Sequence, residues 1–153
     1  MRKEYTYISK NTLQYVYLHD CDCAHMYYAE NCLIFEMEWM EILREHPQNP
    51  FSQAYQSGAG RIELFQPKII ECTLAIKDNK NVRSVETVQE LDYYGLEFLE
   101  YEQECRKSDG YYADLFLIFD RDSCYDNIFL KIEYQWSTVA WNTFNGVSWI
   151  ECI

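Results

Sequence analysis

Apolar and polar residues alternate along much of this chain, and this period-two pattern constrains its fold more than any other feature. In the stretch 32–39 every odd-numbered residue is apolar, whereas Glu36 and Glu38 lie between them. In the stretch 128–136 every even-numbered residue is apolar. Because successive side chains of a strand point to opposite faces of a sheet, both stretches predict half-buried β-strands.

Further stretches predict strands of the same kind. The stretch 111–119 is apolar on both faces except at Asp114, which predicts a central strand. The stretch 69–76 places four apolar residues on one expected face: Ile70, Cys72, Leu74 and Ile76. Short runs at 5–9, 13–19, 23–28 and 61–65, together with the strand-like runs beside 109–110 and 145–146, bring the total to about ten strands, more than one flat sheet holds comfortably.

Turn residues favour antiparallel pairing of these strands. Asp109-Gly110 and Asn145-Gly146 each separate two strand-like runs and supply the positive φ of tight hairpins, and a third hairpin is expected at 29–31. We therefore predict one mainly β domain over residues 1–153. Its expected form is an antiparallel two-sheet sandwich or a closed barrel.

Two stretches depart from the strand pattern. Val85, Val88 and Leu91 are spaced three apart with acidic residues between them, which predicts one short helix at about 84–93. The stretch 44–60 contains two prolines and two glycines and predicts a loop of about 17 residues, longer than most connections. Long ordered loops often carry function, and the sequence leaves open whether this one does.

The composition excludes several classes of protein. The 25 acidic and 13 basic residues give a net charge of −12, which repels nucleic acids and anionic membrane surfaces and favours a basic partner.

No stretch approaches the ~18 apolar residues that a membrane span needs, so a cytoplasmic protein is expected. Seven irregularly spaced cysteines predict reduced thiols rather than a disulfide framework. No phosphate-binding loop, nucleophile elbow or metalloprotease motif is present, so no cofactor is expected.

The segment 19–25 concentrates two imidazoles, two thiols and two carboxylates. In an extended strand, His19, Cys21, Cys23 and His25 share one face, and the outer pair lies on the order of 20 Å apart. One zinc ion cannot collect all four across that distance. A turn could gather them, but the segment lacks Gly, Pro and Asn. We interpret it as a structural strand, with a metal site, thiol chemistry or a partner contact as the alternatives.

Carboxylates and tyrosines form the other candidate surface. Carboxylates at period two are typical of a solvated strand face, although a pair of them could also serve as acid and base in a glycosidase-like site. Several of the 14 tyrosines are adjacent in sequence, so some of their rings must lie outside the core. The residues expected to contact a partner are Glu36, Glu38, Glu100, Glu102, Glu104, Tyr27 and Tyr112.

In size, charge and composition the chain resembles the acidic immunity proteins that bacteria pair with nuclease or other cationic toxins. The segment Leu18-His19-Asp20-Cys21, with Asn49-Pro50 and the glycines before 61–65, also resembles a pattern of uncharacterised small bacterial β proteins. The resemblance implies a bacterial binding protein. The matched positions are few and carry over no functional residue.

These observations predict a non-catalytic acidic binding protein, an immunity or inhibitor protein that occludes a basic protein partner such as a toxin. The alternative is a small-molecule-binding β-barrel or a weak hydrolase with an aromatic-lined pocket. A flat acidic face would favour the first function, and a deep aromatic pocket with convergent polar groups would favour the second.

Overall fold

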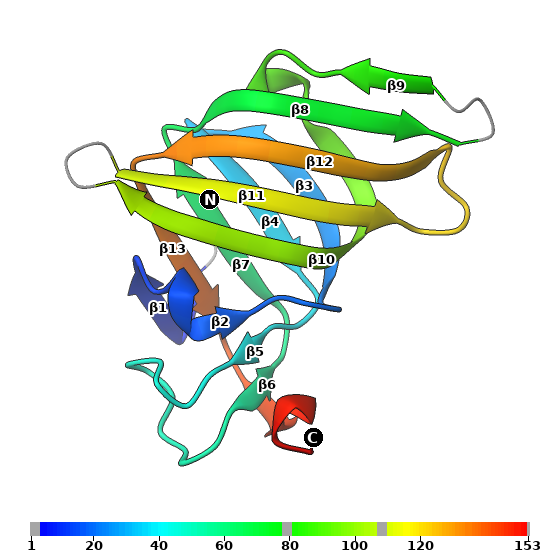
Figure 1. Cartoon of the computed structure of the whole chain (residues 1–153). Coiled ribbons are helices and arrows are strands. Elements are labelled where there is room, and N and C mark those ends of the chain that lie inside the picture. Colours follow the sequence, from blue (N-terminus) through cyan, green and yellow to red (C-terminus); the bar gives the residue numbers. More distant parts are fainter. Residues whose placement is uncertain (1–3, 78–80, 107–109, 153) are drawn as a thin grey trace.

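The alternating stretches form strands, as Figure 1 shows for the computed structural model, which describes residues 4–77, 81–106 and 110–152. The strands are β1 (Tyr7–Lys10), β2 (Val16–Tyr17), β3 (Asp22–Ala29), β4 (Cys32–Met37), β5 (Glu41–Ile42), β6 (Tyr55–Ser57), β7 (Gly60–Phe65), β8 (Lys68–Ile76), β9 (Asn81–Ser84), β10 (Asp92–Arg106), β11 (Gly110–Phe119), β12 (Tyr125–Tyr134), β13 (Trp136–Trp141) and β14 (Phe144–Val147). Three short 3-10 turns lie between or after them: η1 (Leu13–Tyr15), η2 (Val88–Glu90) and η3 (Trp149–Cys152).

The strands are arranged in two antiparallel sheets. The first has ten strands in the order β1-β13-β7-β4-β3-β10-β11-β12-β8-β9, and the second has four short strands in the order β14-β6-β5-β2. The two sheets pack as a sandwich and do not close into a barrel. The predicted mainly β antiparallel fold is therefore confirmed, and of the two predicted architectures the sandwich is the one that forms.

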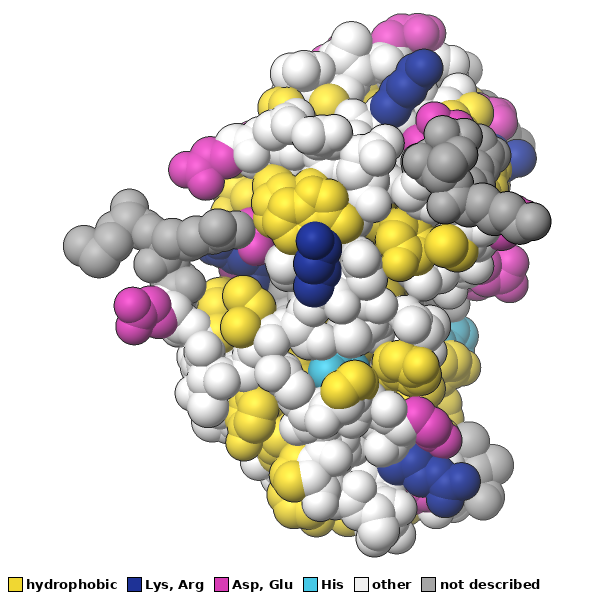
Figure 2. Space-filling view, turned by 90° about the vertical axis from the view of Figure 1, so that its left-hand side faces the viewer, with side chains coloured by type: hydrophobic (Ala, Val, Ile, Leu, Met, Phe, Trp, Pro, Cys, Tyr) yellow, Lys and Arg dark blue, Asp and Glu magenta, His cyan; other side chains and the backbone are white. Residues whose placement is uncertain are grey.

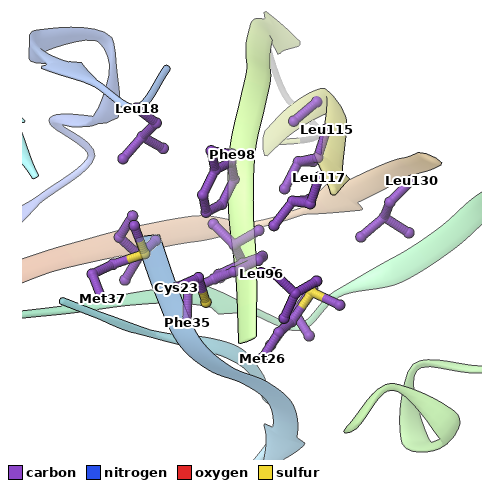
Figure 3. Packing of buried hydrophobic residues seen from close by; sticks show 14 of the residues in the cluster. Leu18, Cys23, Met26, Phe35, Met37, Leu96, Phe98, Leu115, Leu117 and Leu130 are labelled. Atoms are coloured by element: carbon purple, nitrogen blue, oxygen red, sulfur yellow. The ribbon is translucent and has the colours of Figure 1, made fainter. Parts of the chain in front are cut away.

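The core includes Val16 and Ile42 of the small sheet, but most of it lies within the large sheet, which folds over between β3 and β10. In Figure 1, β10, β11, β12 and β8 lie in front of β3, β4, β7 and β13. Their inner faces meet, so that Phe35 of β4 and Phe98 of β10 lie with ring centroids 5.3 Å apart. Figure 3 shows side chains of both layers directed toward one another, among them Met26, Leu96 and Leu117, all fully or almost fully buried.

The small sheet holds the C-terminal part of the chain through a buried carboxylate. Glu41 of β5 is 0% exposed and accepts hydrogen bonds from Ser148 Oγ at 2.7 Å and Gln56 Nε2 at 3.4 Å. Burial raises the pKa of this carboxyl above its ordinary value, and the two hydrogen bonds offset only part of that rise. Glu41 thereby links β5 to the segment that follows β14.

The three predicted hairpin turns have different outcomes. Glu30 and Asn31 connect β3 to β4 with φ values of 52° and 62°, as a tight hairpin requires. Gly110 has the expected positive φ of 89° and begins β11, while Asp109 lies outside the described residues. The hairpin predicted at Asn145-Gly146 is wrong, because both residues lie within β14 at an irregularity in its pairing with β6.

The helix predicted at about 84–93 is reduced to the single 3-10 turn η2 (Val88–Glu90). Its three apolar residues, Val85, Val88 and Leu91, are buried as the pattern predicts. A spacing of three suits a 3-10 turn, in which residues i and i+3 are eclipsed. The helix cannot continue because Asp92 begins β10 and pairs with Tyr27 of β3.

The loop predicted at 44–60 is partly ordered by its own side chains. The amide of Asn49 donates to the carbonyls of Ile42, Leu43 and Gln53 at 3.1–3.2 Å. His46 is 2% exposed, and burial lowers its pKa to about 4. The end of the predicted loop is strand rather than loop, since it contains β6 (Tyr55–Ser57) and the first residue of β7.

One residue of β8 differs from the predicted face pattern. Cys72 and Leu74 are buried as expected, but Ile70 is 46% exposed. The pairing with β12 shifts at this point, from Glu71 opposite Lys131 to Ile69 opposite Ile132. This bulge turns Ile70 away from the core.

The bulge in β8 can be tested with two truncations on one strand. Leu74→Ala is expected to lower the free energy of unfolding by about 2–5 kcal/mol, because it leaves a cavity in the core. Ile70→Ala, the matched control, is expected to cost less than about 1 kcal/mol. Urea denaturation followed by circular dichroism measures both, and equal losses would contradict the bulge.

Candidate functional site

The structure separates the residues of the segment 19–25. The pairing of β3 with β4 shifts between Cys23, opposite Met37, and His25, opposite Glu36, so that a bulge at Ala24 places the thiol and the imidazole on different faces. The interpretation of 19–25 as one extended strand, in which all four candidate ligands share one face, is therefore wrong, because His19 and Asp20 form a turn and β3 begins only at Asp22. Cys21 and Cys23 are 0% and 1% exposed and point into the core.

Burial makes the two thiols unsuitable for chemistry. Burial, with a smaller contribution from nearby carboxylates, raises the pKa of Cys21 and of Cys23 to about 12. A protonated, inaccessible thiol is neither a nucleophile nor a metal ligand. Within the residues the structure describes, no group of three or more His, Cys, Asp or Glu could hold a metal ion.

The thiols can be counted by reaction with Ellman's reagent. We expect three of the seven cysteines, Cys105, Cys124 and Cys152, to react in the folded protein, and all seven to react in denaturant, because the other four are buried. Rapid reaction of a fourth thiol, mapped by mass spectrometry to Cys21 or Cys23, would contradict the placement of these residues.

The two histidines of the segment have different surroundings. His25 stacks between Tyr94, at a centroid distance of 3.9 Å, and Tyr27, at 4.2 Å, and its Nε2 donates to Asp92 Oδ1 at 2.6 Å. His19 lies at the other end of the segment, where its Nδ1 donates to the carbonyl of Leu99 at 2.7 Å. The local sequence gives no indication of this contact, because 80 residues separate its partners.

Glu36 and Tyr27 belong to a polar network on the outer face of β3, β4 and β7. Arg61 Nη2 lies 2.6 Å from Glu36 Oε1, and the Tyr27 hydroxyl donates to the same oxygen at 3.0 Å. Beside this network is a hollow of about 550 Å³, lined by Tyr5, Ile8, Arg61, Glu63, Trp136 and Thr138, among others. Glu36 is thus already paired within the protein, and its role as a partner contact stays a prediction.

Glu38 lies with three other carboxylates at one edge of the sandwich. The pKa of Asp22 is raised to about 6, because partial burial and the charges of Glu38, Glu97 and Asp120 oppose its ionisation. The backbone explains the convergence, since Glu97 pairs with Asp22 and the Glu38 N–H donates to the Asp22 carbonyl at 2.9 Å.

Asp22→Asn is expected to stabilise the fold above pH 6 and to have little effect below about pH 4. A carboxyl whose folded-state pKa is raised holds its proton more tightly in the folded protein, so its ionisation between the ordinary pKa of 3.8 and about 6 lowers stability. Melting temperatures of both proteins across this range measure the effect. An equal shift at every pH would contradict the raised pKa.

The remaining carboxylate candidates lie together in the second half of β10. Glu100, Glu102 and Glu104 are exposed and follow one another at alternate positions, so that they project from the same face of the strand. We call these three residues the acidic ridge. In the part of the chain that the structure describes, no Lys or Arg side chain forms an ion pair with them.

A hollow lies on each side of the acidic ridge, each with a volume of about 310 Å³. The first, which we call the His19 groove, runs between residues 16–19 and residues 99–102 of β10. The second is lined by Glu102, Gln103, Glu104, Tyr112 and Asp114. Glu102 lines both, and the structure thus gathers four of the seven predicted partner-binding residues: Glu100, Glu102, Glu104 and Tyr112.

Comparisons with known proteins add nothing to this geometry. No protein-family model, no curated protein and no solved structure matches the chain. Among the described residues, no helix has the length and apolar character needed to cross a membrane.

Proposed function

We propose that this protein is a non-catalytic binding protein whose acidic ridge binds a basic protein partner and occludes it, in the manner of an immunity or inhibitor protein acting on a cationic toxin. One observation carries the proposal. Three exposed carboxylates stand in a row between two hollows, and no described cation neutralises them.

The net charge supports a fast encounter with such a partner. A charge of −12 attracts a basic protein from a distance, and unpaired carboxylates at one site then orient it. On the face in Figure 2, hydrophobic side chains form several separate patches rather than one broad apolar surface. Charge is the feature of the ridge best suited to select a partner, because its three carboxylates are exposed.

The hollows beside the ridge provide contacts that charge alone lacks. Tyr17 is 41% exposed and lines the His19 groove, where its ring centroid lies 6.1 Å from that of His19. Tyr112 lines the opposite hollow. Tyrosine gives a rigid surface for the aliphatic stem and the charged end of a Lys or Arg side chain. A basic side chain in either hollow would meet Glu102 together with an aromatic ring.

The alternative of a ligand-binding β-barrel has less support. The ten-stranded sheet does not close, so the described strands enclose no barrel interior for a ligand. The hollow of about 550 Å³ near Arg61 contains aromatic and polar groups, but the guanidinium of Arg61 is already bound by Glu36.

The triple variant Glu100→Gln, Glu102→Gln, Glu104→Gln is expected to bind a fluorescent octalysine peptide about tenfold more weakly, because three ion pairs of about 0.5 kcal/mol each are lost. Fluorescence anisotropy at low ionic strength measures the affinity. Binding to the unmodified protein should weaken steeply when salt is added.

A second triple variant provides the control for net charge. Glu30→Gln, Glu45→Gln and Glu86→Gln remove the same number of exposed carboxylates away from the ridge. These changes are expected to alter the affinity less than about twofold. If both triple variants weaken binding equally, the peptide senses only net charge and the ridge is not a binding site.

A further inference from the structure

Of the strands that the structure describes, only β11 pairs with the second half of β10. Pairing with β11 continues to Arg106, whereas pairing with β3 ends at Glu97, opposite Asp22. Beyond this point the last contacts on the β3 side come from Asp20 and Cys21, whose backbones bond to Phe98, and from His19, whose Nδ1 donates to the Leu99 carbonyl at 2.7 Å. Among the described strands, none pairs with residues 99–106 of β10 on this side.

The reason for the gap is a change of direction in the chain before β3. Asp20 has a φ of 67°, and the strand just before it, β2 (Val16–Tyr17), belongs to the small sheet. The residues before Asp20 therefore do not continue the β3 side of the large sheet along β10. The His19 groove is the space that this separation leaves along the edge of β10.

The direction of the free backbone groups follows from the register. The Phe98 N–H donates to Cys21 at 3.0 Å and its carbonyl accepts from Asp20 at 2.8 Å, so both groups point away from β11. After the bulge at Leu99, Glu100 lies opposite Phe116. Because bonding pairs alternate in an antiparallel ladder, the Glu100 backbone then bonds to β11.

The same alternation assigns the next residues. Tyr101 and Gln103 direct their N–H and carbonyl groups away from β11, toward the free edge, whereas Glu102 and Glu104 direct theirs to β11. Unpaired backbone groups along an extended strand are a template for another strand. The acidic ridge lies on this same segment.

We propose that an extended basic segment of the partner adds to β10 as a strand along residues 100–105, with alternate Lys or Arg side chains beside the acidic ridge. This inference rests on the proposed function and specifies its geometry. Charge complementarity selects the occupant, because cross-strand pairs of opposite charge stabilise a sheet and like pairs destabilise it. An acidic or neutral segment would lack these pairs.

The test uses an eight-residue peptide of alternating Lys and Thr with blocked ends, and amide hydrogen exchange of the full protein followed by NMR. In the free protein, the amides of Tyr101 and Gln103 should exchange quickly, and those of Glu102 and Glu104 slowly. Saturating peptide should slow exchange at Tyr101 and Gln103 at least tenfold and leave Glu102 and Glu104 nearly unchanged.

A matched peptide separates strand addition from charge attraction. The same sequence with every backbone nitrogen methylated keeps its charges and loses all backbone donors. It is expected to bind at least fivefold more weakly and to leave exchange at Tyr101 and Gln103 unchanged.

Equal affinity of the two peptides, without slowed exchange, would overturn strand addition and leave the proposed function standing. Failure of both peptides to bind would overturn both. Slow exchange at Tyr101 and Gln103 in a free protein that sediments as a dimer would assign the edge to a second copy of the chain and overturn the proposed occupant.

Discussion

The structure depends on the packing around Phe98, where the large sheet folds over. The ring of Phe98 is 1% exposed and lies against Phe35 of the other layer, while its backbone bonds to Asp20 and Cys21. This residue thus joins the two layers through its side chain and through its backbone at once. Burying both inner faces is the main favourable term for a sheet of this kind, and it requires the fold-over.

The candidate site is a consequence of the same point. The chain turns away at Asp20, so β10 continues beyond Phe98 with β11 as the one described strand that pairs with it. The bulge at Leu99 then sets which residues point outward, and three glutamates occupy those positions. The free edge, the groove and the acidic ridge therefore have one structural origin.

The buried faces of strands with uninterrupted alternation could be predicted from the sequence, whereas those of strands with a bulge could not. In β4 and β12 the apolar face is continuous and buried as the sequence indicates, up to Met37 and Tyr134. Trp39 and Trp136, which the pattern assigns to the same faces, lie beyond these strands and are only partly buried. Bulges at Ile70, Ala24 and Leu99 shift the face pattern by one residue, and a single inserted residue leaves no clear mark in a local pattern. For this reason the local pattern predicts the wrong face for Ile70 and His25 and does not give the bounds of β10 (Asp92–Arg106).

The sequence predicts the carboxylates of the candidate site but not which of them the fold brings together. Glu100, Glu102 and Glu104 stand out in the sequence because they recur at period two, and Glu36 and Glu38 have the same spacing. Only the structure distinguishes the two groups, by placing Arg61 against Glu36 and no described cation against the ridge. His19 and the free edge of β10 have no local signal, since both depend on contacts between distant segments.

The sequence by itself determined the β class, most of the buried faces and the acidic charge, because alternation and composition act over neighbouring residues. Only the tertiary structure decided that the thiols of Cys21 and Cys23 are inert, which carboxylates stay unpaired, and where the sheet keeps an open edge. These properties depend on strand register and on the fold-over at Phe98, which long-range packing sets and local sequence does not encode.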